Sequence, residues 1–92
     1  MPYRIEVRDD ALADLEALPA NLRQRMTKAM ESRLGLDPAR YGIRLRRDLR
    51  GLWKLRVGDY RIAYEIEGQV VRVWAILHRK LVYPEVGRRI GG

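Results

Sequence analysis

The side chains that could do chemistry in this chain are mostly arginines, and they are gathered in its second half. Sixteen of the nineteen cations are Arg; residues 43–92 carry twelve cations against five acids, whereas residues 1–42 carry seven of each. Arg binds phosphate in a bidentate manner and stacks on nucleobases. We therefore expect a polyanionic partner for residues 43–92. The absence of Cys and the single His exclude disulfides, thiolate centres and multi-His sites, so we expect no metal and no cofactor.

Two of these arginines are expected to face each other on a β-hairpin. Three segments have the pattern of strands joined by two-residue turns, namely 52–57, 60–66 and 69–78, with turns at 58–59 and 67–68. The turns then predict the register, in which Arg56 faces Arg61 and Arg61 faces Trp74. Opposed arginines repel each other unless an anion lies between them, and a neighbouring Trp offers a surface for base stacking.

The same register predicts one apolar and one basic face for the sheet. The basic face is expected to carry Lys54, Arg56, Arg61, Ala63, Glu65, Arg72, Trp74, Ile76 and His78. Other readings stay open, because Arg56 could pair with Asp59, and Trp74 could pack under the tail or contact a partner protein. A further basic run over 44–50 is expected to be mostly loop, with a short strand near 43–47.

The elements that must position these residues follow from periodicity. A strand is expected at 3–7, a first helix after Asp9, and a second helix capped by Asn21 and stopped by Gly35. The fold class is α+β, with two N-terminal helices packed on one face of a small antiparallel sheet of about four strands. Residues 1–92 are expected to form one domain, with a tail broken by Pro84 and Gly87. No apolar run could span a membrane or serve as a signal core, which predicts a cytoplasmic protein.

Two motifs in the second half resemble a known family. They are LRVGDYRIAYEI at 55–66 and AILHRKLVY at 75–83, preceded by LRG at 49–51. Together they resemble the RelE/ParE superfamily of toxins from bacterial type II toxin–antitoxin systems, and the likeness extends over nearly the whole chain. The resemblance implies a RelE-like fold and one of two activities: ribosome-dependent mRNA cleavage, or inhibition of DNA gyrase without cleavage. It also implies neutralisation by a cognate antitoxin protein.

The resemblance also implies roles for individual residues. Arg61 matches a phosphate-binding arginine, Lys54 a basic strand residue of the active site, and Tyr83 a C-terminal tyrosine of the RelE site. Arg79 approximately matches a second active-site arginine, whereas His78 matches no residue of the best-known RelE site. The chain departs from the pattern at position 52, where Leu replaces a lysine, and in the tail.

Metal-free RNA cleavage uses the 2′-hydroxyl as nucleophile and needs a base, an acid and positive charge on the phosphorane. Arg is always protonated and can only stabilise charge, so the base or acid must come from His78, Tyr83, Lys54 or a carboxylate. His78 is the most economical candidate, because His titrates nearest neutral pH. His78 could instead close the strand end, and Tyr83 could be a packing or antitoxin contact. RNA contacts are expected from Arg56, Arg72, Trp74, Arg46, Arg47 and Arg50. The preferred hypothesis is a ribosome-dependent mRNA endoribonuclease; a ParE-like gyrase inhibitor and a degenerate toxin that retains only antitoxin binding are the alternatives.

Overall fold

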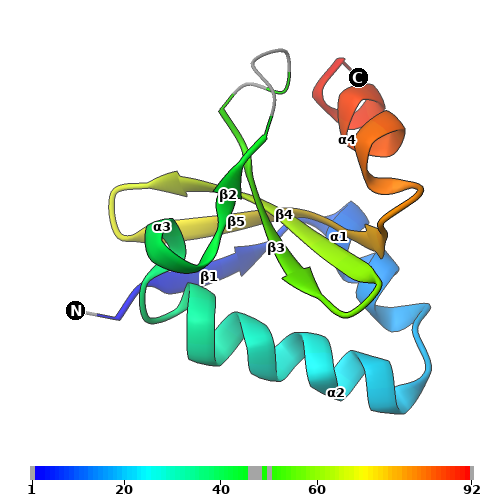
Figure 1. Ribbon diagram of the computed structural model, residues 1–92, viewed down its shortest axis with the longest axis horizontal. Helices are drawn as coiled ribbons and strands as arrows, with labels where there is room; N and C mark the ends of the chain where they lie inside the picture. Colours follow the sequence, from blue (N-terminus) through cyan, green and yellow to red (C-terminus); the bar gives the residue numbers. More distant parts are fainter. Residues whose placement is uncertain (1, 46–48, 50, 92) are drawn as a thin grey trace.

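Five strands and four α-helices make up the part of the chain that the computed structural model describes, residues 2–45, 49 and 51–91 (Figure 1). In chain order the elements are β1 (Arg4–Val7), α1 (Asp9–Glu16), α2 (Ala20–Ala29), the π-helix η1 (Met30–Leu34), α3 (Pro38–Tyr41), β2 (Ile43–Arg44), β3 (Trp53–Val57), β4 (Tyr60–Glu67), β5 (Val70–His78) and α4 (Val82–Gly91). None of these described helices is both long and apolar enough to cross a membrane. The expected α+β class and the two N-terminal helices are confirmed.

The sheet has five strands in the order β1-β5-β4-β3-β2, rather than about four. It is also not purely antiparallel, because β1 runs parallel to β5, while the other neighbouring pairs are antiparallel. The short strand expected near 43–47 is β2, which pairs with only two residues of β3, Trp53 and Lys54. The rest of β3 therefore forms an edge of the sheet.

The helices begin and end close to the expected places. Two acidic side chains occupy the first turn of α1, where the helix dipole favours negative charge. The second helix begins at Ala20 with Pro19 as its N-cap residue, so the prediction of Asn21 as N-cap is wrong. This helix continues as η1, and Gly35 follows it as expected.

The first hairpin has the predicted register, and the second does not. Val57 pairs with Tyr60 and Arg56 lies opposite Arg61, as the turn at 58–59 predicts. The second turn lies at 68–69 instead of 67–68. In both hairpins a glycine with a φ of about +60° occupies the first turn position, and this requirement for a positive φ decides where the second turn falls.

A β-bulge in the β4–β5 pairing further alters the register. It lies at Ala63 and Tyr64, which pair with Ala75 and Val73, so Trp74 is the extra residue of β5. The expected cross-strand row of two arginines and Trp74 is therefore wrong, and Leu77 lies opposite Arg61 instead.

The bulge inverts the facing of every later residue of β5, because side chains alternate along a strand. Ile76 pairs with Ile62 and packs in the core beneath α1 and α2, although it was expected on the basic face. His78 pairs with Tyr60 and shares that face. Ala75 and Leu77, expected on the apolar face of the sheet, lie on the face that α4 covers.

Both faces of the sheet are covered. On one face, α1, α2 and η1 bury Ala11, Met26, Ala29, Met30 and Leu34 against the strands. On the other, α4 packs Val82 and Val86 onto Ala63 and Ala75 (Figure 1). The prediction of a broken tail is wrong, because Pro84 lies in the first turn of α4, where a missing N–H removes no helical hydrogen bond.

Candidate functional site

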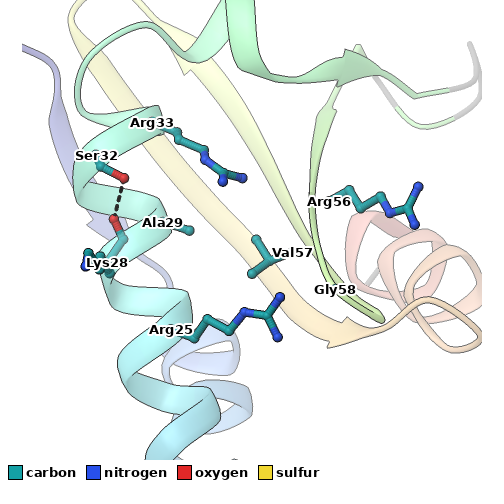
Figure 2. Close-up of a pocket in the computed structure, with 8 residues that line it drawn as sticks. All are labelled: Arg25, Lys28, Ala29, Ser32, Arg33, Arg56, Val57 and Gly58. Atoms are coloured by element: carbon teal, nitrogen blue, oxygen red, sulfur yellow. Dashed lines mark hydrogen bonds between the residues drawn. The ribbon is translucent and has the colours of Figure 1, made fainter.

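A cation-lined groove lies along β3, at the edge of the sheet. It has a volume of about 310 Å³ and is lined by Arg33, Tyr41, Ile43, Lys54, Leu55, Arg56 and Arg61. We call it the β3 groove. Four of its seven lining residues are cations and none is an acid. Three of the four, Lys54, Arg56 and Arg61, were expected from the sequence; Arg33 of η1 is added by the fold, and its side chain extends from the helix toward β3 (Figure 2).

Lys54 and Tyr83 meet on the α4 side of the sheet. The Lys54 Nζ donates a hydrogen bond of 2.6 Å to the Tyr83 Oη, and it lies 5.1 Å from the centre of the tyrosine ring. Lys54 belongs to β3 and Tyr83 to the first turn of α4, so this contact exists only because α4 folds back over the sheet. An ammonium that donates to a phenolic oxygen stabilises the phenolate that remains when the hydroxyl gives up its proton.

Arg56 and Arg61 stand directly opposite each other on β3 and β4. The Arg61 Nη1 donates to the backbone oxygens of Gly58, at 3.0 Å, and Tyr60, at 2.8 Å, which holds the guanidinium at the turn of the first hairpin. Neither arginine makes an ion pair with a carboxylate in the described part of the chain. Like charges directly opposite each other destabilise a sheet, so the pair favours an anionic ligand.

The structure separates His78 from this groove. Its ring packs edge-on against Tyr60, with 5.7 Å between the ring centres, and its Nδ1 accepts a 3.1 Å hydrogen bond from the backbone N–H of Lys80. The bulge places His78 on the α1–α2 face, whereas Lys54 and Arg61 belong to the opposite face. The alternative that His78 closes the strand end fits these contacts.

Arg79 lies near the groove without lining it. Its backbone N–H donates to the Asp59 backbone oxygen at 2.8 Å, and its Nε lies 3.9 Å from the Asp59 Oδ1. The turn at 58–59 thus brings Arg79 to the same end of the sheet as Arg61. The Arg79 side chain is 56% exposed, so it can reach a ligand that extends beyond the groove.

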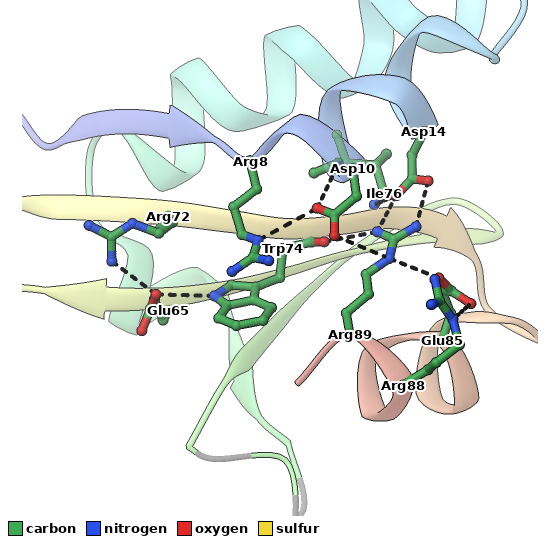
Figure 3. Close-up of polar contacts among 11 residues, drawn as sticks. Arg8, Asp10, Asp14, Glu65, Arg72, Trp74, Ile76, Glu85, Arg88 and Arg89 are labelled. Carbon is green, nitrogen blue, oxygen red and sulfur yellow. Dashed lines mark hydrogen bonds and ion pairs between the residues drawn. The ribbon is translucent and has the colours of Figure 1, made fainter. Parts of the chain in front are cut away.

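Arg72 and Trp74 are held elsewhere, in a polar network that Figure 3 shows in part. Arg72 forms ion pairs with Glu6, Glu65 and Glu67. The Trp74 Nε1 donates to Glu65 at 3.1 Å. Burial alone would raise the pKa of Glu65, but the hydrogen bonds from Arg72 and Trp74 outweigh it and lower that pKa.

One face of the Trp74 indole is covered by an arginine side chain. The Arg8 guanidinium carbon lies 3.8 Å from the centre of the ring, and the ring packs against the core beneath α4. The alternative that Trp74 packs under the tail is the one that these contacts support. Of the remaining residues expected to bind RNA, Arg46, Arg47 and Arg50 lie outside the described residues.

A buried ion pair fastens α4 to α1. The Arg89 Nη1 and Nη2 lie 2.8 and 2.9 Å from the two Asp14 carboxylate oxygens, and the two side chains are only 8% and 9% exposed. The pair also satisfies backbone hydrogen-bonding groups of β5 at and after the bulge. Arg89 donates to the Trp74 backbone oxygen, and Asp14 accepts from the Ile76 N–H (Figure 3). This tether holds the helix that carries Tyr83.

Sequence reasoning missed both the tether and Arg33. Residues 1–42 have balanced charge, so nothing in their composition indicated a basic surface. A helical projection could have shown part of one, since Arg25 and Lys28 are three residues apart; Arg33, five residues after Lys28, joins them because the helix continues as the π-helix η1. No group of three or more potential metal-ligating side chains occurs among the residues that the structure describes.

The comparisons with known proteins place the chain among the toxins of type II toxin–antitoxin systems. Residues 5–83 match a family model described as "ParE toxin of type II toxin-antitoxin system, parDE", and the chain belongs to the RelE/ParE family of toxins. The curated relatives include toxin RelG of Mycobacterium tuberculosis, which is 32% identical over 85 residues, or 90% of this chain and 98% of that protein. Toxin RelE of the same organism is 36% identical over 77 residues, or 84% of this chain and 78% of that protein.

Solved structures agree with this assignment. The toxin–antitoxin complex RelBE2 from M. tuberculosis contains a chain that superposes with a TM-score of 0.81 at 31% identity, covering 86% of this chain and all of that one. A mutant of the E. coli toxin RelE in the free state gives a TM-score of 0.77 at 21% identity, with 98% and 99% of the two chains covered, and supports the fold alone.

Proposed function

We propose that the protein is a ribosome-dependent mRNA endoribonuclease that inhibits translation. The observation that carries the proposal is the Lys54–Tyr83 hydrogen bond beside a groove that is lined by cations and free of acids. It joins a group able to give up a proton to a set of groups able to stabilise a phosphorane. The likeness to RelE and RelG toxins supports the same activity. Action on ribosomes would place the protein in the cytoplasm.

In the proposed reaction, the 2′-oxygen of the substrate ribose attacks the adjacent phosphorus and the bond from phosphorus to the 5′-oxygen breaks. The 2′-hydroxyl proton goes to water, and the leaving 5′-oxygen takes the Tyr83 hydroxyl proton. The Lys54 ammonium stabilises the resulting phenolate. Arg61, Arg56 and Arg33 place positive charge on the phosphorane, and the products are a 2′,3′-cyclic phosphate and a 5′-hydroxyl.

This assignment gives Tyr83 the proton-transfer role for which His78 was the first candidate, and Lys54 the role of stabilising the phenolate. His78 lies on the opposite face of the sheet, with its Nδ1 engaged by a backbone N–H. Arg79 remains a candidate for an auxiliary phosphate contact, because it stands at the same end of the sheet as Arg61.

We also propose a cognate antitoxin as the protein partner, with residues 1–92 acting as one toxin domain. The likeness to toxin chains from RelBE2 and from the RelB-RelE complex of Methanococcus jannaschii supports such a partner. The groove favours an acidic antitoxin segment, which would compete with RNA for the same cations.

Gyrase inhibition is the second candidate, favoured by the match to the ParE toxin model. Induced expression without an antitoxin separates the two. If the protein is a ribonuclease, protein synthesis should stop and mRNA should be cut on ribosomes, while plasmid supercoiling persists. Loss of supercoiling with intact mRNA would support the gyrase inhibitor instead.

A Tyr83→Phe variant tests the chemistry. It removes one hydroxyl, and ribosome-bound mRNA should be cut about 10²–10⁴-fold more slowly in single-turnover assays. Tyr3→Phe removes a hydroxyl from a tyrosine packed at the helix-side core, and should cut at the wild-type rate. A Tyr83→Phe variant as fast as wild type would refute the proposed acid.

A further inference from the structure

A second and larger basic groove lies beside the β3 groove, between the second helix and the end of β3 (Figure 2). It has a volume of about 430 Å³ and is lined by Arg25, Lys28, Ala29, Ser32, Arg33, Arg56, Val57 and Gly58. We call it the α2 groove. Half of its lining residues are cations and none is an acid.

The cations of this groove lack the carboxylate partners that several arginines elsewhere in the fold have. On the opposite side of the sheet and on α4, Arg4, Arg8, Arg72, Arg88 and Arg89 all form ion pairs with carboxylates. In the described part of the chain, no carboxylate lies within ion-pair distance of the four cations of the α2 groove. The carboxylates of these ion pairs lie on β1, α1, β4 and α4, and none of them compensates the cations of the α2 groove. Such a cluster favours a polyanionic ligand.

The α2 groove continues into the β3 groove. Arg33 and Arg56 line both. The passage follows the free edge of β3, since β2 pairs only with Trp53 and Lys54. From Arg25 to Arg33 the helix rises by about 12 Å, so the cations are spread along a path rather than gathered at one point.

The lining favours a phosphate backbone over a peptide. Its only apolar members are Ala29 and Val57, which offer no pocket for the large apolar anchors that hold a bound peptide. Arg25 points toward the hairpin turn in Figure 2, and a side chain at Gly58 would meet its guanidinium, with 3.1 Å between a Cβ there and the Arg25 Nη1. Glycine at this position leaves room for the Arg25 side chain at the mouth of the groove.

We propose that the α2 groove binds the sugar–phosphate backbone of RNA that continues from the β3 groove around the edge of β3, with Arg25 and Lys28 contacting phosphates outside the cleaved bond. This inference rests on the proposed ribonuclease function and extends it to a second RNA-binding surface. The RNA is either the mRNA itself or ribosomal RNA next to it, and both present the same backbone.

The test is a double variant, Arg25→Ala/Lys28→Ala, which leaves the β3 groove untouched. Binding to ribosomes programmed with mRNA should show a log–log salt dependence that is shallower by about 1.4, since each lost phosphate contact to a single strand removes about 0.7. The cleavage rate at saturating toxin should stay at the wild-type level. The control, Arg4→Ala/Arg88→Ala, removes the same charge from arginines that are about 70% exposed and paired with Glu6 and Glu85, and should keep the wild-type slope.

The outcomes separate the possibilities. If the double variant binds ribosomes that carry mRNA more weakly than wild type but binds empty ribosomes equally well, mRNA is the ligand. If its binding to both kinds of ribosome is weaker, ribosomal RNA is the ligand. A double variant with the same affinity and salt slope as its control overturns the inference, as does a variant that loses affinity only for an acidic antitoxin peptide. A wild-type protein that binds ribosomes through Arg25 and Lys28 but cuts no mRNA would refute the proposed function, while RNA binding by the α2 groove would remain supported.

Discussion

Replacing Arg89 by methionine should destabilise the protein strongly, because Arg89 is one half of a buried ion pair. The substitution keeps a long apolar stem but removes both contacts to Asp14 and the donor to the Trp74 backbone oxygen. The Asp14 side chain is 9% exposed, so its carboxylate would be left buried with the Ile76 N–H as its hydrogen-bond donor from the strand. Breaking a buried pair on one side costs about 3–5 kcal/mol.

For a chain of this size, 1 kcal/mol shifts the melting temperature by about 4–8 °C, so Arg89→Met should melt at least about 12 °C below wild type. Urea denaturation followed by circular dichroism gives the free energy of unfolding directly. The matched control is Arg88→Met, the same substitution one residue earlier on α4. Its guanidinium is 70% exposed and pairs with Glu85, so its stability should stay close to that of wild type.

A second substitution tests the sign of the effect. Asp14→Asn should destabilise the wild-type protein, because it weakens the pair. In the Arg89→Met background the same change should increase stability, because it removes the unpaired buried charge while the amide oxygen can still accept from the Ile76 N–H. If Arg89→Met and Arg88→Met unfold alike, or if Asp14→Asn destabilises both backgrounds equally, the tether does not hold α4 as argued.

Four shorter predictions concern other residues of the fold and of the candidate site. His78→Gln should slow mRNA cleavage by less than about 10-fold, and a loss of 10²-fold or more in single-turnover assays would return it to the proton-transfer role. Arg61→Ala should cost about 1 kcal/mol or less by urea denaturation yet abolish toxicity; a folded, toxic variant contradicts its phosphate role. Gly42→Ala should lower stability by about 1–3 kcal/mol in thermal melts, since its methyl group would collide with the Tyr64 hydroxyl, and unchanged melting would show that β2 can shift. Hydrogen bonds from two α4 arginines lower the pKa of Glu85 to about 2, so its stabilising contribution is present above the usual carboxyl pKa of about 4.3 and lost as pH falls toward 2; the stability difference between wild type and Glu85→Gln should therefore vanish over that range in acid titrations.

Local patterns in the sequence were sufficient to predict the first hairpin, the second helix and the family of this protein. The turn at Gly58-Asp59 predicted the first hairpin and placed Arg56 opposite Arg61, because a two-residue loop leaves only one register. Periodicity predicted the second helix and its end near Gly35, which the structure shows as α2 and η1. The motifs at 55–66 and 75–83 predicted the family, which the comparisons show.

The tertiary structure alone decided which of the charged residues share a site. The extra residue at Trp74 inverts the rest of β5 and moves His78 to the other face, and a bulge has no reliable signature in a strand pattern. Nothing in the sequence indicated that Arg72 is paired, because only the fold brings the carboxylates of Glu6, Glu65 and Glu67 to it. Tyr83 reaches Lys54 because α4 forms in spite of Pro84 and Gly87, through burial of Val82 and Val86 and the pair formed by Arg89 with an aspartate 75 residues earlier. Spacing along the chain reports contacts over a few residues, whereas burial and ion pairing between distant segments depend on the whole chain being folded.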